Sequence, residues 1–299
     1  MAAPEVAVEF LRREVIAGAV QRRADELGGA LPRVELANFP LPDGSALRLI
    51  DGGGGGIWNP RDFLATLSIV TSPDGPYEDR ESDGGLLHYS YQRGRGAGRN
   101  AKLDRARELG LPVLRLHKIA DSWYQPIYPV FVIDDNPFER TFVMTLDEAL
   151  RALPAGRDLS PIEKLYAART VRQRVHQPAF RARVLLAYGR ECTICSLRHV
   201  ELLDAAHIIE DRDDDGVPVV SNGLSLCKIH HAAYDRQFLG IDPDYKVVVN
   251  SALLEEVDGP MLRHGLQEMH GRSLTLPKQR RDHPDRDGLA RRFAIFQAG

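Results

Sequence analysis

The sequence is poor in cysteine, in long apolar runs and in net charge, and each shortage excludes a class of protein. Only three of the 299 residues are cysteine, which argues against a disulfide scaffold and favours a reducing compartment such as the cytoplasm. No apolar run approaches the roughly 20 residues of a membrane span, and acidic Glu5 and Glu9 do not fit an export signal. The formal net charge of -3 means that any nucleic-acid contact must come from local basic patches.

The remaining composition is that of an ordinary globular protein. Hydrophobic residues make up 43% of the chain and charged residues 27%, which is typical of a folded domain. A chain of this length favours two domains rather than one.

All three cysteines lie in one short stretch together with closely spaced histidines. Cys192-x-x-Cys195 is followed about 30 residues later by Cys227-x-x-His230. Each pair brackets a tight turn, so the four side chains can converge on one tetrahedral zinc ion. Because four protein ligands leave no open position for a substrate, we expect this zinc to be structural.

Three polar residues of the same stretch are not used by the zinc site: His207, Asn222 and His231. With a strand over Leu202 to Ile209 and a helix from about Cys227, the segment from Tyr188 to Tyr245 resembles the HNH (ββα-metal) nuclease family in its zinc-knuckle version. The resemblance implies that His207 is the general base, that His231 binds Mg2+ or Mn2+, and that Asn222 orients His207 or fixes the loop. Adjacent helical residues point about 100° apart, so His230 can face the zinc and His231 the hairpin. For His207 the alternative is a core histidine.

The carboxylate ligand of the catalytic ion is open. Many members of that family have an acidic residue directly before the first histidine, and this chain has Ala206 there. Asp204 lies three residues before His207 and faces the opposite side of a regular strand unless a bulge intervenes. Asp235 lies four residues after His231, on the same helix face. The acidic run 210–215 is expected to be a solvated loop between the hairpin strands, with a second metal site as the alternative.

The front of the chain contains short strand-like segments between about Ile57 and Val143, interrupted by one helix over Asn100 to Leu109, which predicts a small β-barrel or sandwich. Residues 75–94, GPYEDRESDGGLLHYSYQRG, resemble the SRA (YDG) domain, and the likeness extends over about 45–145. It implies a PUA-like barrel that binds flipped 5-methylcytosine.

The same resemblance assigns base-binding residues. Tyr77 and Tyr89 would sandwich the base, with barrel packing as their alternative. Asp79 is the nearest carboxylate for the cytosine amine, although a position that eukaryotic readers use for it is Arg80 here. Four basic residues among glycines would contact phosphates or belong to a solvated loop: Arg93, Arg95, Arg99 and Lys102.

Helical segments surround these two regions. A helix over Pro4 to Leu27 has Val8, Leu11, Val15 and Ala19 on one face, which indicates a packing helix or a dimer contact. A long basic helix begins at Pro161 and contains Arg169, Arg172 and Arg174, and we expect Pro178 to break it. We further expect a strand in GIDPDYKVVVN and a helix over Leu289 to Phe296.

The sequence therefore predicts an α+β protein in which a PUA/SRA-like β-barrel reader precedes a zinc-stabilised ββα-metal nuclease. The expected divisions are an N-terminal helical segment (1–40), the reader (41–145), a helical linker (146–185), the HNH domain (186–250) and a C-terminal extension (251–299). The predicted function is that of a modification-dependent DNA endonuclease, which acts on double-stranded DNA carrying a modified cytosine. The first candidate for this modified base is 5-methylcytosine. Because one HNH site cuts one strand, we expect a homodimer or repeated binding.

Two other functions fit the same residues. One is an HNH nuclease that recognises phosphorothioate, another cytosine adduct or a plain sequence. The other is a non-catalytic zinc-stabilised DNA-binding protein, which the retention of His207, Asn222 and His231 argues against.

Overall fold

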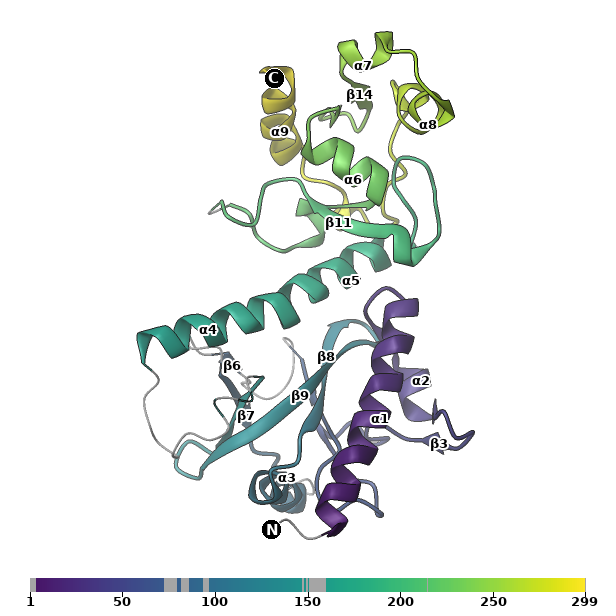
Figure 1. Ribbon diagram of the computed structural model, residues 1–299. Helices are drawn as coiled ribbons and strands as arrows, with labels where there is room; N and C mark the ends of the chain where they lie inside the picture. Colours follow the sequence, from purple (N-terminus) through teal and green to yellow (C-terminus); the bar gives the residue numbers. More distant parts are fainter. Residues whose placement is uncertain are drawn as a thin grey trace. The chain divides into compact units, whose positions relative to one another are not determined.

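The computed structural model (Figure 1) describes residues 4–72, 80–81, 86–93, 97–146, 148, 150, 160–213 and 215–298, with the backbone alone at 80, 81 and 97. The chain divides into two compact units, Met1–Ala179 and Phe180–Gly299. Within the described ranges, no helix is both long and apolar enough to cross a membrane.

Unit 1 is built on one curled sheet. Its strand order is β4 (Ile57–Trp58), β5 (Ser68–Thr71), β8 (Val113–Ala120), β9 (Trp123–Asn136), β10 (Thr141–Thr145), β7 (Leu87–Ser90) and β6 (Arg80–Glu81), and β1 (Leu31–Pro32) also pairs with β9. Neighbouring strands of this sheet are antiparallel, except for β5 and β8, which are parallel. The sheet curls into a half-barrel. The predicted α+β class is therefore confirmed, whereas the PUA/SRA-like identity of the small barrel stays a prediction. A separate hairpin joins β2 (Phe39–Pro40) and β3 (Ala46–Leu47).

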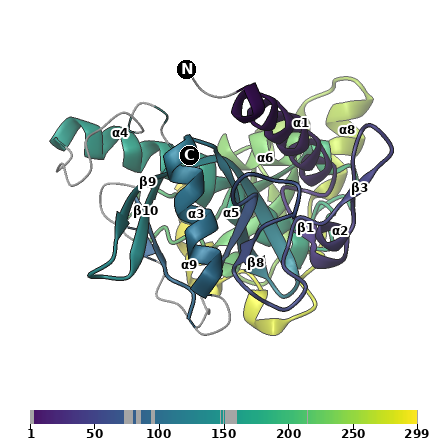
Figure 2. The same ribbon diagram turned by 90° about the horizontal axis from the view of Figure 1, so that it is seen from below.

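The helix α1 (Pro4–Glu26) lies along unit 1 next to β9 (Figure 1 and Figure 2). It packs through the side that carries Glu9, Arg13, Ile16 and Val20, whereas the apolar face expected from the sequence is largely exposed, with Val8 and Leu11 each 66% accessible. The reason is a buried ion pair. Arg13 bonds Glu9 at 2.6 Å and donates to the carbonyls of Thr66, Pro112 and Ala65.

Two further helices belong to unit 1. The short α2 (Arg33–Ala37) follows β1, and α3 (Ala97–Leu109) begins three residues before the predicted start at Asn100. Leu103 and Ala106 of α3 are buried in the same core as Ile127 and Val130 of β9. The helix that interrupts the strands is therefore confirmed.

A long helix begins at Ser160, whose hydroxyl and backbone form a capping box with Glu163. It continues from α4 (Pro161–Val171) through a π-helical turn, η3 (Arg172–His176), into α5 (Gln177–Ala187), which contains the boundary between the units. The prediction that Pro178 breaks this helix is wrong. Proline has no N–H for the Arg174 carbonyl, but Gln125 Nε2 lies 3.3 Å from the carbonyls of both Arg174 and Val175.

Unit 2 contains the predicted hairpin and helix. The strands β11 (Leu203–His207) and β12 (Gly223–Cys227) pair antiparallel, and α6 (Lys228–Asp235) packs against both (Figure 1). The helix α5 approaches the hairpin closely at Gly223, where a Cβ atom would lie 2.5 Å from Val184 and 2.9 Å from Phe180. The two short turns Val200–Leu202 and Val220–Asn222 lead into the strands.

The rest of unit 2 closes its core. The expected strand after Gly240 is a hairpin of β13 (Leu239–Ile241) and β14 (Val247–Val249). It is followed by α7 (Ser251–Glu255), α8 (Pro260–Gly265), the 3-10 turns Gln267–Met269 and Arg280–Asp282, and the confirmed C-terminal helix α9 (Arg286–Ala298). Side chains from the hairpin, α6 and the C-terminal part share one apolar core, among them Leu224, Tyr234 and Leu289.

Candidate metal centre and nuclease site

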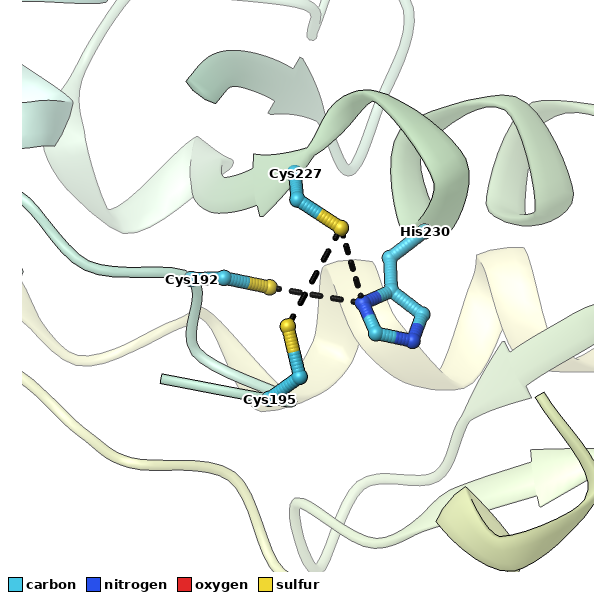
Figure 3. A group of neighbouring side chains, drawn as sticks. All are labelled: Cys192, Cys195, Cys227 and His230. Atoms are coloured by element: carbon cyan, nitrogen blue, oxygen red, sulfur yellow. Dashed lines mark hydrogen bonds between the residues drawn. The ribbon is translucent and has the colours of Figure 1, made fainter. Parts of the chain in front are cut away.

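The four predicted zinc ligands converge in unit 2 (Figure 3). Cys192 and Cys195 come from the turn before β11, Cys227 ends β12 and His230 lies in the first turn of α6. The ligand atoms of all four lie within 4.8 Å of one another, and among the residues with described coordinates this is the one such group. His230 is 2% exposed and Cys192 is fully buried.

The spacing of these atoms fits zinc. A tetrahedron with Zn–S of about 2.3 Å and Zn–N of about 2.0 Å requires S···S distances of about 3.8 Å and S···N distances of about 3.5 Å. The structure has 4.0 Å between the Sγ atoms of Cys195 and Cys227, and His230 Nδ1 lies 3.5 Å from Cys192 Sγ and 3.2 Å from Cys227 Sγ. The remaining ring nitrogen of His230 lies 2.8 Å from the carbonyl oxygen of Gly265. That contact orients the ring for ligation through Nδ1.

The close packing of the four ligands changes their pKa values in opposite directions. Hydrogen bonds from Cys195 and Cys227 lower the pKa of the Cys192 thiol far below its usual range. Burial opposes the charged form of His230, but its hydrogen bonds with Cys192 and Cys227 outweigh burial and raise its pKa to about 10. The ligands therefore share protons that a bound metal ion would displace.

The two consecutive histidines face different neighbours, as predicted. His230 points to the cysteines, whereas the ring of His231 lies between two carboxylates. His231 Nδ1 is 3.6 Å from Asp204 Oδ2, and His231 Nε2 is 3.3 Å from Asp235 Oδ2. Both carboxylates that the sequence left open thus contact this histidine.

The two carboxylates have different surroundings. Asp204 is 31% exposed and also contacts two cations, Lys228 Nζ at 3.3 Å and Arg181 Nε at 3.7 Å. Asp235 is 56% exposed, and its second oxygen lies 3.9 Å from Arg292. Asp204 therefore carries more positive charge around it than Asp235.

His207 lies on the other face of β11. The register runs without a shift from the pair Leu203–Cys227 to the pair His207–Gly223, so no bulge brings Asp204 to the side of His207. Asp204 contacts α6, whereas the His207 ring stacks on Phe180 of α5 at 4.1 Å between centroids. The expectation that these two side chains face opposite sides is confirmed.

Asn222 is 6% exposed and binds the backbone of the loop between the hairpin strands. Its Oδ1 accepts from the Ile209 N–H at 2.8 Å, and its Nδ2 donates to the carbonyls of Ile209 and Val217 at 3.0 Å each. Of the two roles that the sequence left open, these bonds support fixing of the loop.

The acidic run 210–215 lies in that same loop, as expected. Two of its carboxylates form ion pairs with arginines: Glu210 with Arg212 and Arg292, and Asp215 with Arg291. Residue 214 lies outside the described part of the chain. Within the described residues, the run takes part in no metal cluster of the kind formed by the cysteines.

The predicted base-binding residues of unit 1 are described in part. Tyr77, Asp79 and Arg95 lie outside the described residues. Tyr89 is 3% exposed and belongs to the core under the sheet, and a Cβ atom on Gly56 would lie 2.5 Å from its hydroxyl. This position favours the packing alternative for Tyr89.

Three of the basic residues that were predicted to contact DNA phosphates lie in the described part of the chain, and their surroundings differ. Arg93 and Lys102 are exposed. Arg99 pairs with Asp51 at 3.1 Å and donates to the Ile57 carbonyl at 3.2 Å. Arg99 therefore holds the glycine-rich loop that follows Asp51.

Three side chains next to the nuclease residues were not predicted: Arg181, Lys228 and Arg292. Lys228 lies three residues before His231 on the same helix, a spacing that the sequence displays. Arg181 and Arg292 reach the site from α5 and α9, and no local pattern connects them to it.

Comparison with family models agrees with this arrangement. Residues 192–242 match the model of an HNH endonuclease family, and no curated protein matches the chain. One similar solved structure is the modification-dependent TagI restriction endonuclease, with 21% identity, 81% of this chain and 85% of that chain covered, and a TM-score of 0.30. Another is the Type IV phosphorothioation-dependent restriction endonuclease ScoMcrA, with 15% identity and a TM-score of 0.22. The match covers 60% of this chain and 54% of that chain.

The family match spans the zinc ligands, the hairpin and α6, which are the parts that carry His207, Asn222 and His231. The two solved structures are too distant to extend the likeness to what this chain binds. Residues 192–242 are an HNH endonuclease domain, and the protein is an endonuclease.

Proposed function

We propose that this endonuclease cuts DNA in response to a modified cytosine, with 5-methylcytosine as the first candidate. Unit 1 would recognise the flipped base and unit 2 would hydrolyse a nearby phosphodiester bond. Its cutting part is carried by His231 held between two carboxylates, next to a closed Cys/His cluster, within a matched HNH domain. Its recognition part rests on the resemblance of residues 75–94 to the SRA domain.

The catalytic roles divide among the residues of the hairpin and α6. His207 accepts the proton of the attacking water, and the new P–O bond forms as the bond to the leaving oxygen breaks. His231 and a carboxylate would hold Mg2+ or Mn2+, which would supply positive charge to neutralise the charge developing on the phosphate. Asn222 holds the loop that follows His207.

Asp235 is the more suitable carboxylate of the two. Asp204 is engaged by two cations, Lys228 at 3.3 Å and Arg181 at 3.7 Å. Asp235 lies one turn after His231 on the same helix face and faces it with an oxygen that, among the described residues, has no cation beside it. Asp204 instead orients Lys228, whose exposed ammonium group is placed for a DNA phosphate.

Recognition of the base would rest on Tyr77 and Asp79, whereas Tyr89 is buried in the core of unit 1. A tyrosine ring stacks on the flipped base, and a carboxylate accepts from the cytosine amine. Arg93 and Lys102 are exposed and suit phosphate contacts. Tyr77→Ala should therefore weaken binding to modified DNA and leave binding to unmodified DNA unchanged.

Cutting of both strands would use two copies of the chain, since one HNH site cuts one strand. The exposed face of α1, with Val8, Leu11 and Val15, is an apolar surface suited to contact between copies. A homodimer would place two nuclease sites on one duplex.

The experiment compares one plasmid prepared with and without 5-methylcytosine, incubated with the protein and Mg2+ or Mn2+. The proposal predicts cutting of the methylated plasmid alone. Equal cutting of both would refute the recognition role of unit 1, and a parallel series with phosphorothioate and bulkier cytosine adducts would identify another specificity.

A further inference from the structure

The C-terminal helix α9 contributes one side chain to the surroundings of the nuclease site, although it lies outside the matched HNH residues 192–242. That side chain is Arg292, which is 12% exposed. Its guanidinium carbon lies 5.1 Å from the centre of the Tyr234 ring on α6. A mostly buried guanidinium interacts more strongly with nearby carboxylates than a solvated one does.

Arg292 contacts acidic residues on both sides of the site. Its Nη1 donates to Glu210, in the loop after β11, at 3.2 Å, and its Nη2 lies 3.9 Å from Asp235 Oδ1, at the end of α6. The first contact is a hydrogen bond, whereas the second has the length of an ion pair. Arg292 therefore connects the loop of the hairpin to the helix that carries His231.

The two oxygens of Asp235 have different neighbours. Oδ1 faces Arg292, and Oδ2 faces His231 Nε2 at 3.3 Å. A carboxylate anchored through one oxygen presents the other in a fixed direction, which is how outer contacts orient metal-binding residues.

The helix that carries Arg292 is firmly docked. Leu289, three residues before Arg292, is fully buried in the core of unit 2. Phe293 and Phe296 lie over β13 so closely that a Cβ atom on Gly240 would be 2.5 Å from Phe296. The position of Arg292 is thus determined by packing, and a charge held in this way preorganises the carboxylate that it contacts.

We infer that Arg292 is a positioning residue of the nuclease: it holds Asp235 so that Oδ2 and His231 together bind the divalent ion. The inference rests on the metal-binding role proposed for His231 and Asp235. It assigns to the C-terminal helix a part in catalysis that the HNH residues alone do not supply.

The test measures Mn2+ binding to the zinc-loaded full chain by the loss of the electron paramagnetic resonance signal of free Mn2+, together with cleavage at a series of Mn2+ concentrations. His231→Ala identifies the site that is measured. Arg292→Gln should weaken Mn2+ binding about 10-fold or more, and Arg292→Lys should restore part of it. Arg291→Gln is the matched control, because its neighbour Arg291 is 57% exposed and pairs with Asp215 instead. This control should bind Mn2+ as the unmodified protein does.

Several results would overturn the inference. One is unchanged Mn2+ binding in Arg292→Gln, and another is an equal loss of Mn2+ affinity in Arg291→Gln. A third is a loss of Mn2+ affinity in Arg292→Gln that is accompanied by zinc release or a lowered melting temperature and is not restored in Arg292→Lys. If the unmodified protein binds Mn2+ through His231 but cuts no DNA, the proposed function fails, while the comparison of Mn2+ affinities still decides the role of Arg292.

Discussion

Replacement of Asn222 by alanine should destabilise unit 2 by about 3 kcal/mol. The side chain makes three hydrogen bonds to the backbone of Ile209 and Val217 while being 6% exposed, and each such bond contributes about 1 kcal/mol net. The loss includes the cost of leaving the Ile209 N–H without its acceptor. Asn222→Asp should be similarly destabilising, because one of its oxygens would face two carbonyl oxygens.

The assay is urea unfolding of the zinc-saturated protein, followed by cleavage at a temperature where each variant is folded. Asn250→Ala is the control, since Asn250 makes one capping bond, to the N–H of Ala252, and its loss should cost about 1 kcal/mol. Unchanged stability of Asn222→Ala combined with complete loss of cutting would refute the loop-fixing role. It would place Asn222 in contact with the reacting groups.

Three other perturbations have definite expected outcomes. Cys227→Ser, or removal of zinc with a chelator, should unfold unit 2, because zinc binding contributes on the order of 10 kcal/mol; zinc content and circular dichroism measure this, and a folded zinc-free protein would contradict it. His207→Ala should abolish cutting but leave zinc content and DNA binding intact, and loss of zinc or folding would show a structural role. Burial of Asp51 opposes its ionisation, but bonds from Arg99 and the Gly55 N–H outweigh burial and lower its pKa. The unmodified protein should therefore have a higher free energy of unfolding than Asp51→Asn. This difference should be fully present above pH about 4 and vanish as the pH falls through the lowered pKa of Asp51. A difference that did not change with pH, measured by urea unfolding at several pH values, would contradict this.

The zinc cluster and the division between His230 and His231 were predictable because both depend on local spacing. Paired ligands three residues apart define a turn, and consecutive helical residues point in different directions. The hairpin register also follows from local sequence, so the placement of Asp204 and His207 on opposite faces was predictable.

Features that depend on distant partners were not predictable. The packed side of α1 carries Glu9 and Arg13, because the carbonyls of Thr66 and Pro112, more than 50 residues away in the chain, accept hydrogen bonds from the arginine. Pro178 is accommodated in the helix because Gln125, from strand β9, donates hydrogen bonds to the Arg174 and Val175 carbonyls. Arg292 reaches Asp235 from a helix more than 50 residues away in the chain, a contact that no periodicity indicates.

The most direct test of the central claim is the rate of cutting of one labelled DNA duplex, synthesised with cytosine or with 5-methylcytosine at the same position, in the presence of Mn2+. His231→Ala serves as the inactive control. We predict rapid cutting of the modified duplex, little cutting of the unmodified one and none by the variant. Equal rates on both duplexes, or undiminished cutting by His231→Ala, would contradict it.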